Sequence, residues 1–276
     1  MTGTGQKAEN AAARAERSRG LQIAARIGFV MSGLVHLLIG WVALRLALGS
    51  SGGEEADQGG AMSSIADAPG GVVLLGVGGL GLACLGIWFL LQAWFEARRQ
   101  RDTKDTVKEA VTNGAKAVVY AVLAFTALRL AFVGGSSDGD ESTQSATSSV
   151  IGNPVGQVLV VIVGLVVIGV GGYHVYKGAT RKFEEDLRRG PSGHASTAVV
   201  GTGIAGFVAK GVALGAVGVL LGWAGIEGES DKAAGLDGAL RMMAGLPAGT
   251  ILLGLVGVGL ILFGIYSFFL ARYADL

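Results

Sequence analysis

The residues best suited to chemistry are a few polar side chains that interrupt long apolar segments. Lys116 and Lys210 stand at equivalent places in two copies of a repeated segment, and the first copy has Ser32 there. His36 and Tyr120 follow Ser32 and Lys116 by four residues, a spacing that puts each pair on one helix face. If these faces meet on a common axis, the five residues line a positive cleft that suits a small anion or an acidic lipid headgroup. The alternative is that both lysines extend to the surrounding headgroups, as lysines near helix ends do.

Motifs on which enzymes, redox carriers and coupled transporters depend are missing from the sequence. It has no HExxH or P-loop sequence, a single cysteine (Cys84), and no Asp or Glu inside its apolar segments. Proton- and sodium-coupled transporters usually need such buried carboxylates. His36 and His174 could hold a haem between two helices, but neither recurs in the other copies, which favours an ordinary packing role. We therefore expect no enzymatic activity, no cofactor and no metal.

The elements that carry these residues are six apolar segments. Hydrophobic residues make up 51% of the 276 residues and charged residues only 16%, against roughly 25% in a soluble domain. The segments lie near 27–48, 72–95, 115–134, 155–176, 199–224 and 249–271, and each is long enough to cross a bilayer. Because polar and apolar residues do not alternate in them, they are predicted to be helices rather than barrel strands. The predicted fold class is an all-α, polytopic membrane helix bundle with six transmembrane helices.

The six segments form three copies of one helical hairpin. Each copy has a proline two residues before a glycine, followed by the same apolar helix with further shared glycines and an aromatic residue. All copies cross the membrane in the same direction, so the repeats are parallel. Proline suits the first turn of a helix, and glycine allows close approach of helices in lipid. The positions predicted to serve structure and packing are Pro69, Gly71, Gly79, Gly86, Pro154, Gly156, Gly164, Gly171, Gly211, Gly215, Gly218, Gly222, Pro247, Gly249, Gly257 and Gly264.

Charged stretches between the hairpins set the predicted boundaries. We predict a polar tail over 1–21, hairpin repeats over 22–98, 108–182 and 198–274, and linkers over 99–107 and 183–197. On the opposite side, the loops over 49–60 and 134–149 are rich in glycine and serine and are predicted to be mobile and solvated.

Basic residues are concentrated on one side of the six segments. The tail and both linkers carry many Lys and Arg residues, whereas the connections over 49–71 and 134–153 carry none. The positive-inside rule therefore predicts a multi-pass plasma-membrane protein with both termini in the cytoplasm. The linkers suit anionic lipids of the inner leaflet and are too short and too mixed in sign for nucleic acid. The expected partners are these lipids and another membrane protein.

These repeated motifs resemble the actinobacteria-rich membrane family called domain of unknown function 1206 (DUF1206). The resemblance covers about 22–274 and rests on three hairpins, the Pro-x-Gly-x-x-Leu start, Ala-Leu-Arg at 43–45 and 127–129, and a basic-Gly step at Lys210-Gly211. Lys116 keeps the basic residue but is followed by alanine, and the first copy has Ser32-Gly33, so a basic triad would be incomplete. The resemblance implies a fold with two transmembrane helices per unit and a membrane location, but no reaction.

Two classes of function follow from the sequence. The first is a non-enzymatic scaffold or interaction protein of the cell envelope. The second is a passive channel or carrier for a small anion or lipid headgroup, through a central cleft near Lys116 and Lys210. Because the third copy lacks equivalents of several polar residues of the first, the scaffold is the preferred hypothesis.

Overall fold

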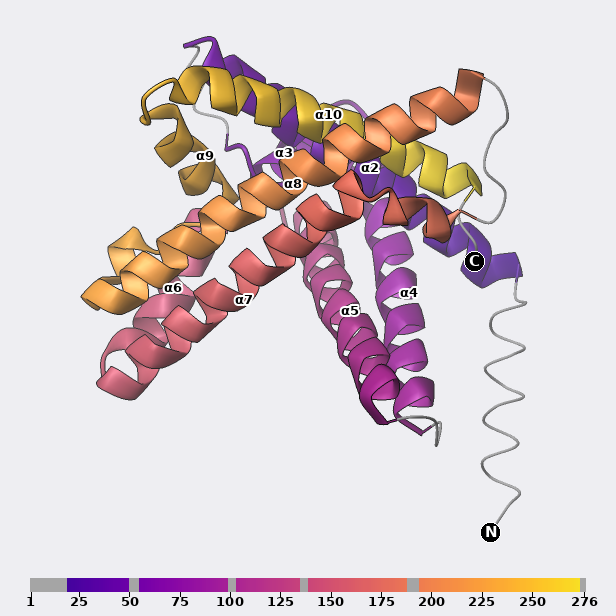
Figure 1. The fold of residues 1–276 in the computed structure, drawn as a ribbon. Helices are drawn as coiled ribbons and strands as arrows, with labels where there is room; N and C mark the ends of the chain where they lie inside the picture. The colour runs from indigo at the N-terminus through magenta and orange to yellow at the C-terminus, as the bar shows by residue number, and fades with distance from the viewer. Residues whose placement is uncertain (1–18, 50–54, 99–102, 135–138, 188–193, 274–276) are drawn as a thin grey trace. The chain divides into compact units, whose positions relative to one another are not determined.

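The structure, a computed structural model, describes residues 19–49, 55–98, 103–134, 139–187 and 194–273 (Figure 1). The helices are α2 (Arg19–Ala47), α3 (Gln58–Asp67), α4 (Gly71–Arg98), α5 (Thr103–Phe132), α6 (Gly139–Ile151), α7 (Pro154–Ala179), η1 (Lys182–Asp186), α8 (His194–Glu227), η2 (Ser230–Lys232), α9 (Leu236–Ala244) and α10 (Gly249–Tyr273). No β-strand occurs within these ranges. Contacts divide the chain into two compact units, the first over 1–31, 65–135 and 276 and the second over 32–64 and 136–275.

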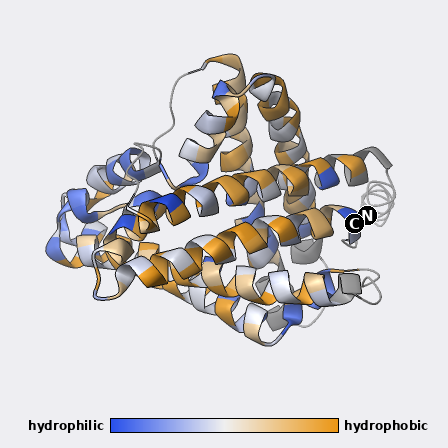
Figure 2. Cartoon of the chain, turned by 90° about the horizontal axis from the view of Figure 1, so that it is seen from above, coloured by the Kyte–Doolittle hydropathy of each residue, from blue (hydrophilic) through white to orange (hydrophobic). Residues whose placement is uncertain are grey.

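The prediction of an all-α fold with six helices able to cross a membrane is confirmed. The qualifying stretches are Arg26–Ala47, Gly71–Trp94, Ala110–Phe132, Pro154–Ala179, Thr197–Glu227 and Gly249–Tyr273. Hydrophobic residues run along most of the length of the long helices (Figure 2). A chain with six such helices is a multi-pass membrane protein by the length and composition of its helices.

Parts of the predicted tail and of both predicted linkers lie outside the described residues. They are residues 1–18 of the tail, 99–102 of the first linker and 188–193 of the second. Helix α5 begins at Thr103, inside the predicted linker 99–107, and η1 occupies the start of the linker 183–197.

The glycines of each returning helix lie against the outgoing helix of the following copy. In the second unit, a methyl group built on Gly171 of α7 would lie 2.6 Å from the carbonyl oxygen of Gly211 on α8. A methyl group built on Gly264 of α10 would lie 2.8 Å from the carbonyl oxygen of Gly33 on α2. Cβ atoms in real structures essentially never come closer than 3.0 Å to such an atom. These two helix pairs therefore need glycine at the point where their backbones touch.

The same helix pairs make a second close contact two turns away. A methyl group on Gly164 would lie 2.8 Å from the carbonyl oxygen of Gly218, and one on Gly257 would lie 3.0 Å from the carbonyl oxygen of Gly40. Seven residues separate the two contacts on each helix, which keeps them on one face because seven residues make nearly two turns.

The first unit has the corresponding pair, α4 with α5, in a looser form. A methyl group on Gly86 would lie 3.4 Å from the carbonyl oxygen of Ala117, an ordinary contact. A methyl group on Gly79 would lie 2.9 Å from the side chain of Leu128, which can move. Helix α5 has alanine or leucine where α8 has glycine, and these side chains hold the two backbones farther apart.

Gly215 and Gly222 contribute to packing through their backbones alone. The backbone nitrogen of Gly215 lies 2.9 Å from a methyl group built on Gly171, and that of Gly222 lies 2.6 Å from one built on Gly164. A methyl group on Gly215 or Gly222 itself would meet nothing within 4 Å. In both GxxxG pairs, therefore, only the first glycine needs to lack a side chain.

The glycine of the Pro-x-Gly motif is required by the short helix that precedes it. In each copy a methyl group on this glycine would overlap a carbonyl oxygen six residues earlier, at the end of α3, α6 or α9. The pairs are Gly71 with Ile65, Gly156 with Val150, and Gly249 with Met243.

The motif's proline occupies the first helical turn in only one copy. Pro154 begins α7, preceded by Asn153, whose side chain accepts a hydrogen bond from the Gly156 N–H. Pro69 and Pro247 instead lie two residues before their helices, so the prediction is wrong there. Each is the second residue of a hydrogen-bonded β-turn whose third residue, Gly70 or Ala248, has a φ of 79° or 60°. A type II turn has proline and a positive-φ residue at these positions, which explains why proline is favoured outside the helix.

The prediction of mobile, solvated loops opposite the linkers is wrong for most of the second loop and for the end of the first, which are helical. Helix α3 begins within the first predicted loop and α6 covers most of the second, while 50–54 and 135–138 lie outside the described residues. Glycine and serine suggested a solvated loop, but Gly60, Thr143 and Ser148 are helical, and the Thr143 and Ser148 hydroxyls donate to carbonyls four and three residues earlier.

Candidate functional site

The five residues of the predicted cleft are divided between the two units. Ser32, His36 and Lys210 belong to the second unit, and Lys116 and Tyr120 to the first. A single cleft formed by all five residues therefore stays a prediction, and each group is described by itself.

His36 is buried inside the second unit. It is 7% exposed, and its Nδ1 lies 2.7 Å from the Ser32 carbonyl oxygen. Because a carbonyl only accepts hydrogen bonds, Nδ1 carries a proton and donates it. The His36 ring centroid lies 4.7 Å from that of Phe263. Positions 32 and 36 therefore lie on one helix face, as predicted, and the His36 ring contacts the backbone carbonyl of Ser32.

Lys210 lies over the same phenylalanine. Its Nζ is 4.3 Å from the centroid of the Phe263 ring, and the residue is half-buried. Lys210 and His36 thus share one neighbour, the Phe263 ring. Among the described residues, no carboxylate forms an ion pair with Lys210. A cation–π contact is worth about 0.5–2 kcal/mol.

An aromatic cluster, defined as Phe183, Phe207, Phe263 and Tyr266, fills the space beside these residues. Phe207 lies at its centre, with ring centroids 5.5 Å from Phe183, 5.3 Å from Phe263 and 5.5 Å from Tyr266. Phe183 and Tyr266 are fully buried, at 0% exposure. His174 stacks on Phe207 at 5.9 Å. Side chains therefore occupy the interior of the second unit near Lys210.

Helix η1 closes one end of the aromatic cluster. Arg181 has a φ of 59°, and this left-handed residue turns the chain so that Phe183 enters the interior. The Tyr266 hydroxyl donates a hydrogen bond to the Phe183 carbonyl oxygen at 3.1 Å. Lys177, whose Nζ lies 5.3 Å from the Phe207 ring, pairs with Asp186 at 2.6 Å. Of the two lysines over the cluster, Lys177 thus has an acidic partner.

Lys116 has different surroundings in the first unit. Its Nζ lies 5.0 Å from the centroid of Phe89, and that ring stacks on Tyr120 at 5.5 Å. Lys116 is exposed, whereas Lys210 is half-buried. The two equivalent lysines therefore share a position in the repeat and a neighbouring aromatic ring but differ in burial.

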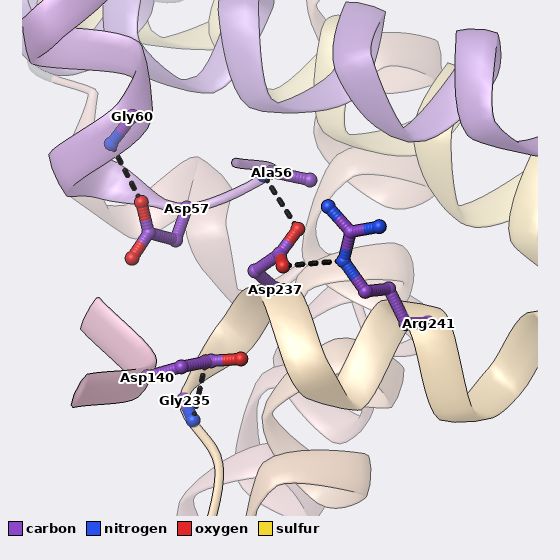
Figure 3. Close-up of polar contacts among 7 residues, drawn as sticks. All are labelled: Ala56, Asp57, Gly60, Asp140, Gly235, Asp237 and Arg241. Carbon is purple, nitrogen blue, oxygen red and sulfur yellow. Dashed lines mark hydrogen bonds and ion pairs between the residues drawn. The ribbon is translucent and has the colours of Figure 1, made fainter. Parts of the chain in front are cut away.

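A second polar site joins the short helices α3, α6 and α9 (Figure 3). We call Asp57, Asp140 and Asp237 the aspartate clasp, because each lies against the start of the next copy's short helix. Asp140 accepts a hydrogen bond of 2.7 Å from the Gly235 N–H, and Asp237 accepts one of 2.8 Å from the Ala56 N–H. The Asp57 carboxylate lies against Gly139.

Two further contacts fix the clasp. Asp57 caps α3 by accepting a bond of 2.7 Å from the Gly60 N–H, and Asp237 pairs with Arg241 Nε at 2.6 Å. Burial raises the pKa of the Asp57 carboxyl above its usual value, the neighbouring charges of Asp237 and Asp140 add to this shift, and the bonds from Gly60 and Gly139 oppose it. No group of His, Cys, Asp or Glu in the described part of the chain has the arrangement of a metal site.

Sequence reasoning did not single out these aspartates and missed their pairing. They lie 12, 14 and 10 residues before the proline of their own copy, so aligning the prolines does not superimpose them. An N-cap pattern was available at Asp57, an aspartate just before a helix. Nothing in the sequence indicated that Asp57 lies against Gly139, at the start of the next copy's short helix.

Three segments of the chain, 27–96, 111–181 and 205–274, match the family model described as Domain of Unknown Function (DUF1206). This confirms the threefold repetition. The chain is also similar to the uncharacterized protein YxxB of Bacillus subtilis (strain 168), with 30% identity over 197 residues that cover 71% of this chain and 70% of that protein. A restriction to actinobacteria is therefore not shown. No solved structure matches the chain.

Proposed function

Because the chain belongs to the family described as Domain of Unknown Function (DUF1206), whose description names no reaction, we propose its function from the geometry: a non-enzymatic membrane scaffold. The observation that carries this proposal is the filled interior of the second unit. A conduit needs polar groups along a water-filled path, whereas the aromatic cluster packs rings against His36 at the level of the expected cleft.

Tight backbone contacts support the same proposal. Helices α7 and α8 touch at Gly171 and at Gly164, and α10 and α2 touch at Gly264 and Gly257. Such contacts resist sliding of one helix past another, since interiors packed without voids switch between few arrangements. A rigid unit suits a protein that holds another protein in place, and suits alternating access poorly.

The proposed partners are membrane lipids and another membrane protein that packs on α7. This helix presents a continuous apolar face outward, including Val158, Ile162, Leu165 and Val166, which are 50–61% exposed. Lipid covers such a face by default. A partner helix would cover it equally well, because lipid tails and apolar side chains offer similar surroundings.

A crosslinking experiment tests the scaffold. A photoreactive amino acid at Leu165, 61% exposed, should give a protein adduct of defined mass in cells, while the same group at Leu253, 0% exposed, should not. Lipid adducts alone at Leu165, Ile162 and Val158 would contradict the proposal.

The alternative is a passive carrier or channel for a small anion or lipid headgroup. It is favoured by one observation, the ammonium of Lys210 without an acidic partner among the described residues. Anion flux in liposomes that Lys210→Leu abolishes at unchanged expression would favour the carrier. The scaffold requires no flux in the original protein.

We place both termini in the cytoplasm of the plasma membrane, following the basic linkers. With Cys84 replaced by alanine, Ser145→Cys on α6 should react with an impermeant maleimide in intact cells. Thr180→Cys at the end of α7 should react only after lysis. The reverse labelling pattern would invert the orientation.

A further inference from the structure

The Lys210 side chain keeps accessible surface although it lies among helices. In the described part of the chain, Ser63 Oγ is the only fully buried side-chain nitrogen or oxygen without a hydrogen-bond partner. Lys210 Nζ makes no hydrogen bond with a described residue, and the residue as a whole is half-buried. Part of the Lys210 side chain therefore remains accessible.

The groups around this ammonium leave its charge without compensation. It lies 4.3 Å from the Phe263 ring, which also packs on the buried His36 ring at 4.7 Å. The nearby Lys177 is already bound to Asp186. A charge in a membrane helix is normally paired or hydrogen-bonded, because leaving it alone is costly. Lys210 has a cation–π contact with Phe263 but no acidic partner among the described residues.

The depth of Lys210 suits an anion at the lipid headgroup level. Its neighbour Gly211 touches Gly171, eight residues before the end of α7 at Ala179, which is about 12 Å along the helix. The 26 residues of α7 span about 39 Å, roughly 9 Å more than the hydrocarbon core. If this excess is shared between both ends, the Lys210 backbone lies about 8 Å below the headgroups, a depth that an extended lysine can bridge.

We infer that Lys210, beside Phe263 and His36, is a binding site for a phosphate-type anion, supplied by the headgroup of an anionic phospholipid. The Phe263 ring lies 4.3 Å from the Lys210 ammonium, whose three protons would donate to phosphate oxygens. Bound lipid would sit at the rim of the aromatic cluster and hold α8 to α10. The site requires no transport and is independent of the scaffold proposal.

The test measures thermal unfolding of the full chain in neutral detergent with added lipid. Phosphatidylglycerol should raise the midpoint more than phosphatidylcholine does. Lys210→Met should weaken the apparent affinity for phosphatidylglycerol roughly 10- to 100-fold, the worth of charge-assisted hydrogen bonds. Methionine keeps the apolar stem, so the variant should fold as well as the original protein in phosphatidylcholine.

Lys177→Met is the matched control. This lysine also lies over the aromatic cluster but is paired with Asp186, so its loss should leave the phosphatidylglycerol response unchanged. Inorganic phosphate serves as a third probe. A rise with phosphate alone, lost in Lys210→Met, would support the anion site and assign a soluble source.

Two results would overturn the inference. One is an equal response of the original protein to phosphatidylglycerol, phosphatidylcholine and buffer. The other is a Lys210→Met variant that unfolds earlier by the same amount in every lipid, which would make the lysine a structural cation–π partner only. Neither result bears on the crosslinks expected from α7, so failure here is distinguishable from failure of the scaffold.

Discussion

Replacing Gly171 by alanine tests whether the backbone contact between α7 and α8 stabilises the protein. The added methyl group would lie 2.6 Å from the Gly211 carbonyl oxygen and 2.9 Å from the Gly215 nitrogen, both backbone atoms that no rotamer change can move. To reach an ordinary contact of about 3.4 Å, the two helices must separate by several tenths of an ångström. Overpacking of this kind costs about 1–3 kcal/mol.

Gly172→Ala is the matched control one position along the same helix. A methyl group there would meet nothing within 4 Å, and alanine favours a helix over glycine by about 1 kcal/mol. The control should therefore unfold at the same temperature as the original protein or slightly above it. Gly171→Ala should lower the midpoint by several degrees, taking about 2–4 °C per kcal/mol.

The three copies give a graded series for the same assay, size-exclusion chromatography of detergent-purified protein after heating. The equivalent substitutions Gly264→Ala and Gly86→Ala would place a methyl group 2.8 and 3.4 Å from the facing carbonyl oxygen. Their cost should follow these distances, largest at Gly171 and smallest at Gly86. Equal midpoints for Gly171→Ala and Gly172→Ala would refute the reasoning, because the two positions differ only in what faces them.

Three further predictions use other sites. Ala248→Gly should raise the free energy of unfolding by about 1 kcal/mol, measured in denaturant, because Ala248 has a φ of 60° and glycine adopts this region without strain; a loss of stability would contradict this. Since the pKa of Asp57 is raised on folding, the stabilisation from its protonated form is present at acid pH and is lost as the pH rises from 3.8 through the raised pKa. Asp57→Asn cannot ionise and should flatten that part of the curve of melting midpoint against pH; an unchanged slope would count against it. Phe183→Ala should lower the free energy of unfolding by about 3–5 kcal/mol, because it empties a fully buried site. Tyr266→Phe should lower it by only about 1 kcal/mol, because it removes one hydrogen bond to the Phe183 carbonyl oxygen. Equal losses of stability for the two variants in a thermal melt would show that the ring of Phe183 is not what stabilises η1.

Helices and their repetition could be predicted because both are properties of local sequence. Apolar length fixes which segments can cross a membrane, and the recurrence of Pro69, Pro154 and Pro247 fixes the copies. The partner of each glycine could not be predicted. A glycine such as Gly171 shows only that something approaches closely, and the spacing is the same whether the neighbour belongs to its own hairpin or to the next.

The site residues show the same division. The spacing of Ser32 and His36 predicted a shared helix face, and the structure has the hydrogen bond. What fills the space beside them depends on residues distant in sequence, such as Phe183, which reaches the interior only because the chain turns at Arg181. Nothing in the charged sequence around Phe183 distinguishes it from a surface residue.

The pairing of α10 with α2 affects how the chain is made. Helix α5 follows α4 from the ribosome within a few residues, and α8 follows α7 almost as closely, but 231 residues separate Gly33 from Gly264. If translation adds about 5–20 residues per second, the face of α2 that carries Gly33 and Gly40 waits roughly 10–50 s for α10. Until translation nears its end, that face lacks its native partner, and a chain that terminates before α10 never acquires it.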